Sequence, residues 1–384
     1  MLLNLHKQEL EDIKNAACYS RQFQFLNAGL TLYSDDTAFI ETFSSIYQNF
    51  IQPAQPKNNI LCYILKNGMQ KSPVAVVDGI GYQLFEKELF FSHAHMIVVQ
   101  HVIDAINDHL LIHAGVVAKN GRGFIISGPS AFGKTTLMLE LVARGYKFYS
   151  DEFCALRLSD FAISAFPRSL GIRKNSPFLK NIEINKCLLL KNIGRGEKFL
   201  IDCKELFPES IGSRCNARYF ILLRGVRNKE HTIQNTIIDL ALYSNNQELI
   251  ESLCKNEGIE LIETCTENNY IIYRFLIALH TGLMNTFRSI CDQYRDDIFY
   301  QEQVVNEIPD FTALPNIERL SKSQASLEML KSIRNRSSKS KLLERFNGKN
   351  SQLLLTIGDF LRNIDCYEMK TGSLHAMAEM IDAL

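Results

Sequence analysis

The sequence lacks a charge imbalance, a long apolar run and a paired-cysteine motif. Its 384 residues contain 42 Lys and Arg against 42 Asp and Glu, so the formal net charge is zero. Nothing in this balance favours a nucleic-acid partner or an acidic membrane surface. No apolar stretch approaches the roughly 18 residues of a membrane-spanning helix. The N-terminal residues turn acidic after a short apolar start, which is not typical of a secretory signal.

The ten cysteines are scattered along the chain, and no two of them form a Cys-x-x-Cys pair. This spacing argues against zinc ligation and against a disulfide framework. We therefore expect most of the cysteines to be small core residues, in a protein of the reducing cytoplasm. The length predicts two or three structural units, and the sequence shows no internal repeat.

The clearest motif that is present is a glycine, four residues, a second glycine, a lysine and a threonine. This is the pattern of a phosphate-binding loop, in which glycines let consecutive backbone N–H groups turn toward a polyphosphate. The lysine adds positive charge, and the threonine hydroxyl can complete a magnesium shell. The candidate nucleotide-binding residues are Gly128, Pro129, Ser130, Ala131, Phe132, Gly133, Lys134, Thr135 and Thr136.

The residues around the motif have the order that such a loop requires. Residues 123–127 are apolar and β-branched, which predicts a buried strand, and residues 134–144 are rich in helix formers. Gly145 stands where a helix stop is expected. The alternative is a simple glycine turn with a lysine on the surface.

An acidic pair, Asp151-Glu152, follows the strand predicted at residues 146–150. In α/β sheets the end of the strand after the motif helix lies beside the phosphate site. One carboxylate could hold magnesium and the other could accept the proton of an attacking hydroxyl. The alternative interpretation is a solvated acidic turn.

Three further side chains are candidates because of their position. His113 lies on the strand predicted before the loop, where a core histidine is an alternative to a catalytic one. Arg168 and Arg173 flank a turn with Pro and Gly, and either could neutralise phosphate charge or be a surface residue. His93 and His95 alternate as on a strand, but no acidic or thiol partner nearby predicts a metal site.

The chain is predicted to be an α/β protein of three parts. Residues 1–100 form a small α/β unit, with strands at 23–33, 59–65 and 74–85 and a helix at 37–50. Residues 101–270 form the core, which a helix at 98–110 precedes and to which a strand at 219–223 belongs. Residues 271–384 are predicted to be mostly helical, with a polar break at 337–341.

These segments resemble the bacterial HPr serine kinase/phosphorylase family, and most closely its divergent HPr-kinase-related branch. The likeness covers roughly residues 110–175 and includes His113-Ala-Gly, the loop, and the segment from Arg144 to Glu152. The segment from Phe166 to Arg173, with its Phe-Pro-Arg core, and the late Asp365-Cys-Tyr-Glu are also similar to that branch.

The resemblance implies a mixed-sheet core like that of phosphoenolpyruvate carboxykinase, with ATP and Mg²⁺ as cofactors. It places a catalytic base at Asp151, a magnesium-associated acid at Glu152 and a supporting role at His113. The chain has Asp-Glu where the kinase/phosphorylases have two aspartates, and Thr135-Thr136 where they have Ser-Glu. These differences argue against reversible phosphorolysis and against HPr as the acceptor. Relatives in this branch phosphorylate a serine of ribosomally made peptides, including lasso-peptide precursors.

The sequence therefore predicts a magnesium-dependent kinase that transfers the γ-phosphoryl group of ATP to a hydroxyl. The expected acceptor is a serine of a protein or peptide, with Asp151, His113 and Arg168 as catalytic residues and Thr135 and Glu152 near the metal. The family likeness also implies a homo-oligomer, whereas neither nucleic acid nor a membrane is an expected partner. Two alternatives stay open: a nucleotide-binding regulator or scaffold without phosphoryl transfer, and a small-molecule kinase.

Overall fold

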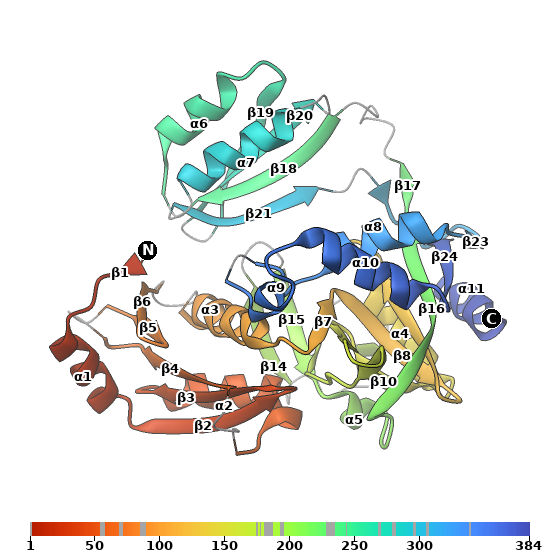
Figure 1. The fold of residues 1–384 in the computed structure, drawn as a ribbon, viewed down its shortest axis with the longest axis horizontal. Helices are drawn as coiled ribbons and strands as arrows, with labels where there is room; N and C mark the ends of the chain where they lie inside the picture. The colour runs from red at the N-terminus through yellow and green to blue at the C-terminus, as the bar shows by residue number, and fades with distance from the viewer. Residues whose placement is uncertain are drawn as a thin grey trace. The chain divides into compact units, whose positions relative to one another are not determined.

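The computed structural model describes residues 2–53, 58–68, 72–84, 90–173, 176, 178–179, 187–192, 196–227, 235–242, 244–267, 270–278, 282–294, 297–304, 307–337 and 339–384. The protein is mixed α/β and divides into two compact units (Figure 1). The smaller unit comprises Met1–Leu2 and Gly225–Pro309, and the larger comprises Leu3–Arg224 and Asp310–Leu384. Within the described ranges, no helix is both long and apolar enough to cross a membrane.

The N-terminal region is built on a six-stranded sheet with the order β1-β6-β5-β4-β3-β2. Its strands are β1 (Leu2–Leu3), β2 (Tyr19–Phe25), β3 (Ala28–Ser34), β4 (Asn59–Leu65), β5 (Val74–Val77) and β6 (Ile80–Gln83). Its helices are α1 (Lys7–Ala16), α2 (Thr37–Ile46), the 3-10 turn η1 (Gln48–Phe50) and α3 (Phe90–Ala105). The predicted α/β character of this region is confirmed.

Three details of this region differ from the prediction: one strand, one helix and the unit boundary. The single strand expected at residues 23–33 is a hairpin of β2 and β3, because the chain reverses at Leu26 with a positive φ of 53°. The helix expected at 98–110 is the second half of α3, so His93 and His95 lie on a helix instead of a strand. The helical period sets this, since Phe90, Ala94 and Ile97 recur on the buried face. The predicted unit boundary at residue 100 falls inside α3, which packs on β3 and β4.

The core sheet has nine strands in the order β10-β8-β9-β16-β12-β11-β7, with β24 paired to both β16 and β23. Only the pairs of β16 with β9 and with β24 are parallel. The strands are β7 (His109–Ile112), β8 (Ala114–Lys119), β9 (Arg122–Ser127), β10 (Lys147–Ser150), β11 (Cys154–Arg157), β12 (Ala162–Ser164), β16 (Arg214–Arg224), β23 (Asn316–Arg319) and β24 (Asp365–Lys370). The predicted hairpin turn at 119–123 and core strand at 219–223 are confirmed.

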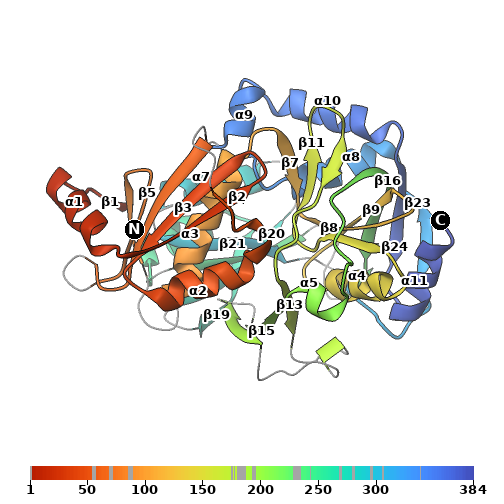
Figure 2. The same cartoon turned by 90° about the horizontal axis from the view of Figure 1, so that it is seen from below.

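Helices cover both faces of this sheet. Ile126 and Ile221 pack on one face with α4 (Lys134–Ala143) and α11 (Leu374–Asp382). Ile125 and Leu222, one residue away, pack on the opposite face with α8 (Lys322–Ser332), α9 (Lys341–Arg345) and α10 (Asn350–Leu361). Figure 2 shows the two groups of helices on opposite sides of β9 and β16. Burial on both faces explains why these strands read as continuous apolar runs.

The larger unit also contains a three-stranded antiparallel sheet, whose strands lie between β12 and β16 in the sequence. Its order is β13-β15-β14, formed by β13 (Leu170–Arg173), β14 (Leu188–Asn192) and β15 (Gly196–Ile201). The short helix α5 (Cys203–Leu206) follows it. This small sheet is relevant to the site because β13 begins two residues after Arg168.

The smaller unit is inserted between β16 and β23. Its antiparallel sheet has the order β19-β20-β18-β21, with β18 (Asn235–Leu242), β19 (Ile259–Glu267), β20 (Tyr270–Ala278) and β21 (Ile298–Val304). The helices α6 (Gln247–Cys254) and α7 (Leu283–Gln293) pack on one face, and β17 (Val226–Arg227) pairs with β22 (Glu307–Ile308). The element order β18-α6-β19-β20-α7-β21 is that of a ferredoxin-like module.

The C-terminal part is less helical than the sequence predicts. The predicted boundary between residues 270 and 271 falls inside β20, whose apolar side chains alternate between the two faces of its sheet. The final segment also contains β24, which extends the core sheet beside β16. Short apolar runs do not distinguish a buried strand from a buried helix, and this ambiguity produced the difference.

Candidate functional site

The glycine-rich loop connects β9 to α4, as predicted. The strand ends at Ser127, the helix begins at Lys134, and Gly145 takes a positive φ of 90° just after the helix. Gly133 precedes the helix with a positive φ of 79°, which disfavours residues that carry a Cβ. At Gly128 a Cβ would come within 2.9 Å of the Leu223 Cβ on β16. Gly133 is therefore favoured by its positive φ, and Gly128 by the close approach of Leu223, and a residue with a Cβ would be strained at either position.

Lys134 is folded back into the loop. Its Nζ donates hydrogen bonds to the carbonyl oxygens of Gly128 at 2.7 Å and Pro129 at 2.8 Å. The side chain is almost fully buried, and burial lowers the pKa of Lys134 to about 8, although Glu152 and Asp151 oppose this shift. The lysine ammonium therefore lies within the loop, where its positive charge can stabilise a bound anion.

The acidic pair follows β10, at the same edge of the sheet as the loop. β10 is antiparallel to β8, and β8 is antiparallel to β9, so β9 and β10 run in the same direction and end together. The expectation of a common sheet edge is confirmed, although an antiparallel strand stands between the two. The Ser150 hydroxyl accepts hydrogen bonds from the backbone N–H groups of Glu152 (3.2 Å) and Phe153 (3.0 Å). This turn fixes the direction in which the two carboxylates leave the strand.

Arg168 lies against both carboxylates. Its Nη2 donates to Glu152 Oε2 at 2.7 Å, and its Nε stands 3.8 Å from Asp151 Oδ1. Asp151 Oδ1 and Arg168 Nε are buried, and neither has a hydrogen-bond partner among the residues that the structure describes. Burying such polar atoms unpaired is unfavourable, and both atoms can bond a ligand or a water molecule. Arg173 is exposed at the end of β13, so of the two candidate arginines it is Arg168 that reaches the acidic pair.

The two carboxylates have opposite pKa shifts. Burial raises the pKa of Asp151 to about 6, and the Arg168 charge only partly offsets this. Burial also opposes the ionisation of Glu152, but the charges of Arg168, of His113 in its protonated form in acid, of Arg334 and of Lys198 outweigh burial and lower the pKa of Glu152 to about 2. Glu152 therefore stays anionic at neutral pH, while Asp151 can take up a proton close to neutrality. Such a divergence between neighbouring acids is typical of acid–base sites.

His113 supports the acidic pair from the junction of β7 and β8. Its Nδ1 is 3.2 Å from the Glu152 carbonyl oxygen and 3.5 Å from Glu152 Oε1. Burial lowers the pKa of His113 to about 4, so the ring is neutral at physiological pH. In this state Nδ1–H can donate to the Glu152 carbonyl, which fits an orienting role better than a charged one.

Four side chains complete the surroundings, and of these the sequence singled out only His95, in another context. Lys198 on β15 and Arg334 after α8 act on the acidic pair through their charges. Tyr47, which is only 2% exposed, bonds the His95 ring at 3.1 Å and acts on the charge of Arg168. Burial disfavours the Arg168 cation, but Glu152, Asp151 and then Tyr47 raise its pKa above the ordinary value. All four come from segments more than 25 residues away in sequence, so no local motif could have marked them.

Thr135 and Thr136 are half-buried in the first turn of α4, next to Lys134. In the described part of the chain, no three His, Cys, Asp or Glu side chains form a ready-made metal centre. Mg²⁺ does not need one, because it binds through one or two carboxylates, substrate phosphates and water. A hydroxyl at Thr135 and the anionic Glu152, beside the unpaired Asp151 oxygen, are oxygen donors of the kind that fit this ion.

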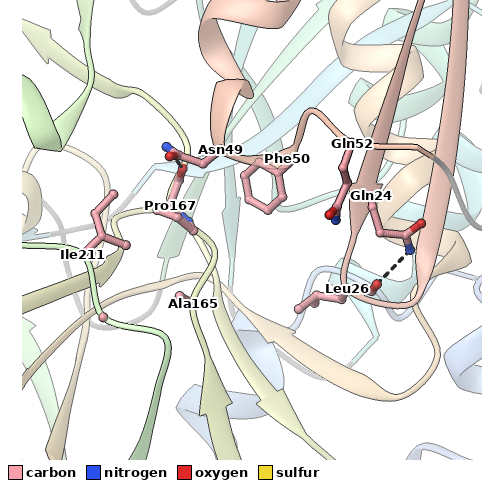
Figure 3. A pocket seen from close by; sticks show the side chains of 9 residues that line it. Gln24, Leu26, Asn49, Phe50, Gln52, Ala165, Pro167 and Ile211 are labelled. Atoms are coloured by element: carbon pink, nitrogen blue, oxygen red, sulfur yellow. Dashed lines mark hydrogen bonds between the residues drawn. The ribbon is translucent and has the colours of Figure 1, made fainter.

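A pocket of about 400 Å³ opens between the N-terminal sheet and the segment 165–167 (Figure 3). Three of its lining side chains are amides, those of Gln24, Asn49 and Gln52, and the Asn49 amide donates to the Pro167 carbonyl at 2.9 Å. The remaining lining residues are Leu26, Phe50, Ala165, Pro167, Ile211 and Gly212. Pro167 is the lining residue that directly precedes Arg168 in the sequence.

No family model and no curated protein matches the sequence. Among solved structures, the chain is similar to the HPr(Ser) kinase/phosphatase from Coxiella burnetii. The match has 16% sequence identity and a TM-score of 0.20, and it covers 48% of this chain and 95% of that chain. Identity and TM-score at this level define neither a family nor a substrate.

Proposed function

We propose that the protein is an ATP- and Mg²⁺-dependent kinase that phosphorylates a hydroxyl, specifically a serine of a protein or peptide. The observation that carries this proposal is the Asp151 carboxylate. This carboxylate is buried, and its pKa is raised to about 6. Its Oδ1 has no hydrogen-bond partner within the described ranges, and its negative charge favours the charged form of Lys134 in the glycine-rich loop. A phosphate cradle and a proton acceptor at one sheet edge are the two parts that phosphoryl transfer to a hydroxyl requires.

The loop supplies the donor side of the reaction. The backbone N–H groups of Gly128, of Ser130 to Lys134 and of the first turn of α4 carry positive partial charge. Such groups favour the binding of an anion. The Lys134 ammonium neutralises the terminal phosphates once it exchanges its two carbonyl partners for phosphate oxygens. Thr135 and Glu152 would hold Mg²⁺, which when bound would neutralise further phosphate charge.

The acidic pair supplies the acceptor side. The serine Oγ forms the new bond to the γ-phosphorus while the bond from the γ-phosphorus to the β,γ-bridging oxygen breaks, and ADP leaves with that oxygen. The serine proton passes to Asp151 Oδ1, whose pKa of about 6 leaves it ionised and still basic at neutral pH. Arg168 and the neutral His113 hold Glu152 in place, so that the two neighbouring carboxylates take different roles.

The pocket lined by Gln24, Asn49 and Gln52 supports a polypeptide acceptor. Its amide side chains can pair with peptide N–H and C=O groups, and its apolar wall around Phe50 and Leu26 suits an uncharged side chain. We assign this pocket to residues that flank the phosphorylated serine.

The test is to separate nucleotide binding from transfer in Asp151→Asn. ATP binding measured by calorimetry should be retained, and label transfer from γ-labelled ATP to lysate proteins should fall by about 10²–10⁴-fold, the usual loss of a general base. Asp359→Asn, which changes an exposed carboxylate on α10, is the matched control and should transfer at the wild-type rate. Transfer by Asp151→Asn at the control rate would refute the assignment of the base.

A further inference from the structure

Phe311 places an aromatic ring directly beside the glycine-rich loop. A Cβ on Gly133 would lie 3.0 Å from Phe311 Cε1 and 3.3 Å from its Cζ, so the ring is in contact with the loop backbone. The ring is nevertheless 45% exposed. Both residues belong to the larger unit, because the chain re-enters that unit at Asp310. An apolar ring open to solvent at the edge of a phosphate cradle is a feature that packing alone does not account for.

The turn that carries Phe311 is rigid. Asp310 Oδ1 accepts hydrogen bonds from the Thr312 N–H (2.9 Å), the Thr312 hydroxyl (2.7 Å) and the Ala313 N–H (3.2 Å). The Asp310 N–H donates to the Thr371 hydroxyl at 3.1 Å, just after β24. The backbone on both sides of the ring is therefore fixed before any ligand binds, which reduces the entropy lost on contact.

We propose that Phe311 is the stacking platform for the purine base of the nucleotide donor. This inference rests on the proposed function, since it takes the phosphates to lie in the loop. With the phosphates at Gly133 and Lys134, the exposed ring that contacts the loop is available to the base of the same nucleotide. Stacking accepts any purine, because every base has a π-face. Phe311 therefore contributes affinity for nucleotides over inorganic polyphosphate and does little to separate ATP from GTP.

The experiment compares two ligands that differ in the base. Calorimetric titrations use MgATP and magnesium tripolyphosphate against the full-length wild type, Phe311→Ala, Phe311→Trp and Leu314→Ala. Leu314 is the matched control because it is 90% exposed on the same turn. Phe311→Ala should weaken ATP roughly 5- to 100-fold, as expected for loss of one base–aromatic stack, and leave tripolyphosphate unchanged. Phe311→Trp and Leu314→Ala should bind both ligands like the wild type.

The remaining outcomes separate this inference from the proposed function. If Phe311→Ala leaves ATP affinity unchanged, or weakens ATP and tripolyphosphate equally, the ring is not a base platform and the inference is overturned. Tripolyphosphate binding by Phe311→Ala also reports that the loop is still folded. If the wild type binds neither ATP nor tripolyphosphate, the phosphate loop itself is wrong, and both the proposed function and this inference are overturned.

Discussion

Nucleotide affinity should fall as the pH rises through the titration of Lys134. In the free protein, burial lowers the pKa of Lys134 to about 8 from an ordinary value of 10.5. Polyphosphate in the loop favours the ammonium form and should return the pKa to its ordinary value or above. Because the pKa is lower in the free protein than in the complex, binding takes up a proton above pH 8. Affinity is therefore fully present below pH 8 and is lost as the pH rises toward 10.5.

The size of the effect follows from these two values. Lys134 in the free protein is about 90% charged at pH 7 and about 10% charged at pH 9, if its pKa is about 8. ATP affinity should then fall about tenfold between pH 7 and pH 9, which corresponds to about 1.4 kcal/mol. The terminal phosphate titrates near pH 6, so the charge of the ligand changes little over this range.

The assay is calorimetric titration with MgATP at pH 7, 8 and 9. Lys134→Arg is the control, since the guanidinium remains charged throughout and its affinity should be independent of pH. Lys134→Met should bind weakly at every pH. A flat profile in the wild type, or the same decline in Lys134→Arg as in the wild type, would refute the role given to the lysine ammonium.

Two further predictions concern the acidic pair and its support. The rate of transfer should rise with pH through about 6 and then level off, because Asp151 must lose its proton to act as base; a profile flat between pH 5 and 7 contradicts this assignment. Tyr47→Phe removes a hydroxyl that bonds His95 and supports the Arg168 cation, so the transfer rate should fall about tenfold with the KM for ATP unchanged. The free energy of unfolding should drop by about 1–3 kcal/mol. A raised KM with unchanged kcat would instead place Tyr47 in nucleotide binding.

The sequence was most informative where chemistry constrains neighbouring residues. The loop needs glycine at positions with positive φ or close backbone contact, so Gly128 and Gly133 could be recognised without a structure. The strand before the loop and the helix after it followed from local periodicity, and the structure confirms both. The placement of Asp151 and Glu152 at the same sheet edge as the loop followed from the order of strand, loop, helix and strand, and it agrees with the strand directions. The contact of Arg168 with the acidic pair was not predicted.

What the sequence did not predict depends on contacts between distant segments. Tyr47 and Lys198 reach the acidic pair from the N-terminal region and from the small sheet, and nothing in their immediate surroundings distinguishes them from other core or surface residues. The ferredoxin-like unit also escaped prediction, because its short strands carry apolar runs compatible with buried helices. The return of the chain into the core sheet at β24 is a non-local pairing of the same kind.

The most direct test of the proposed kinase is transfer of label from γ-labelled ATP, in the presence of Mg²⁺, to lysate proteins and to the products of neighbouring genes. Wild-type protein should label a polypeptide on serine, and Asp151→Asn, with its ATP binding intact, should not. Absence of a labelled polypeptide with an ATP-binding wild type, or equal labelling by both proteins, would contradict the account.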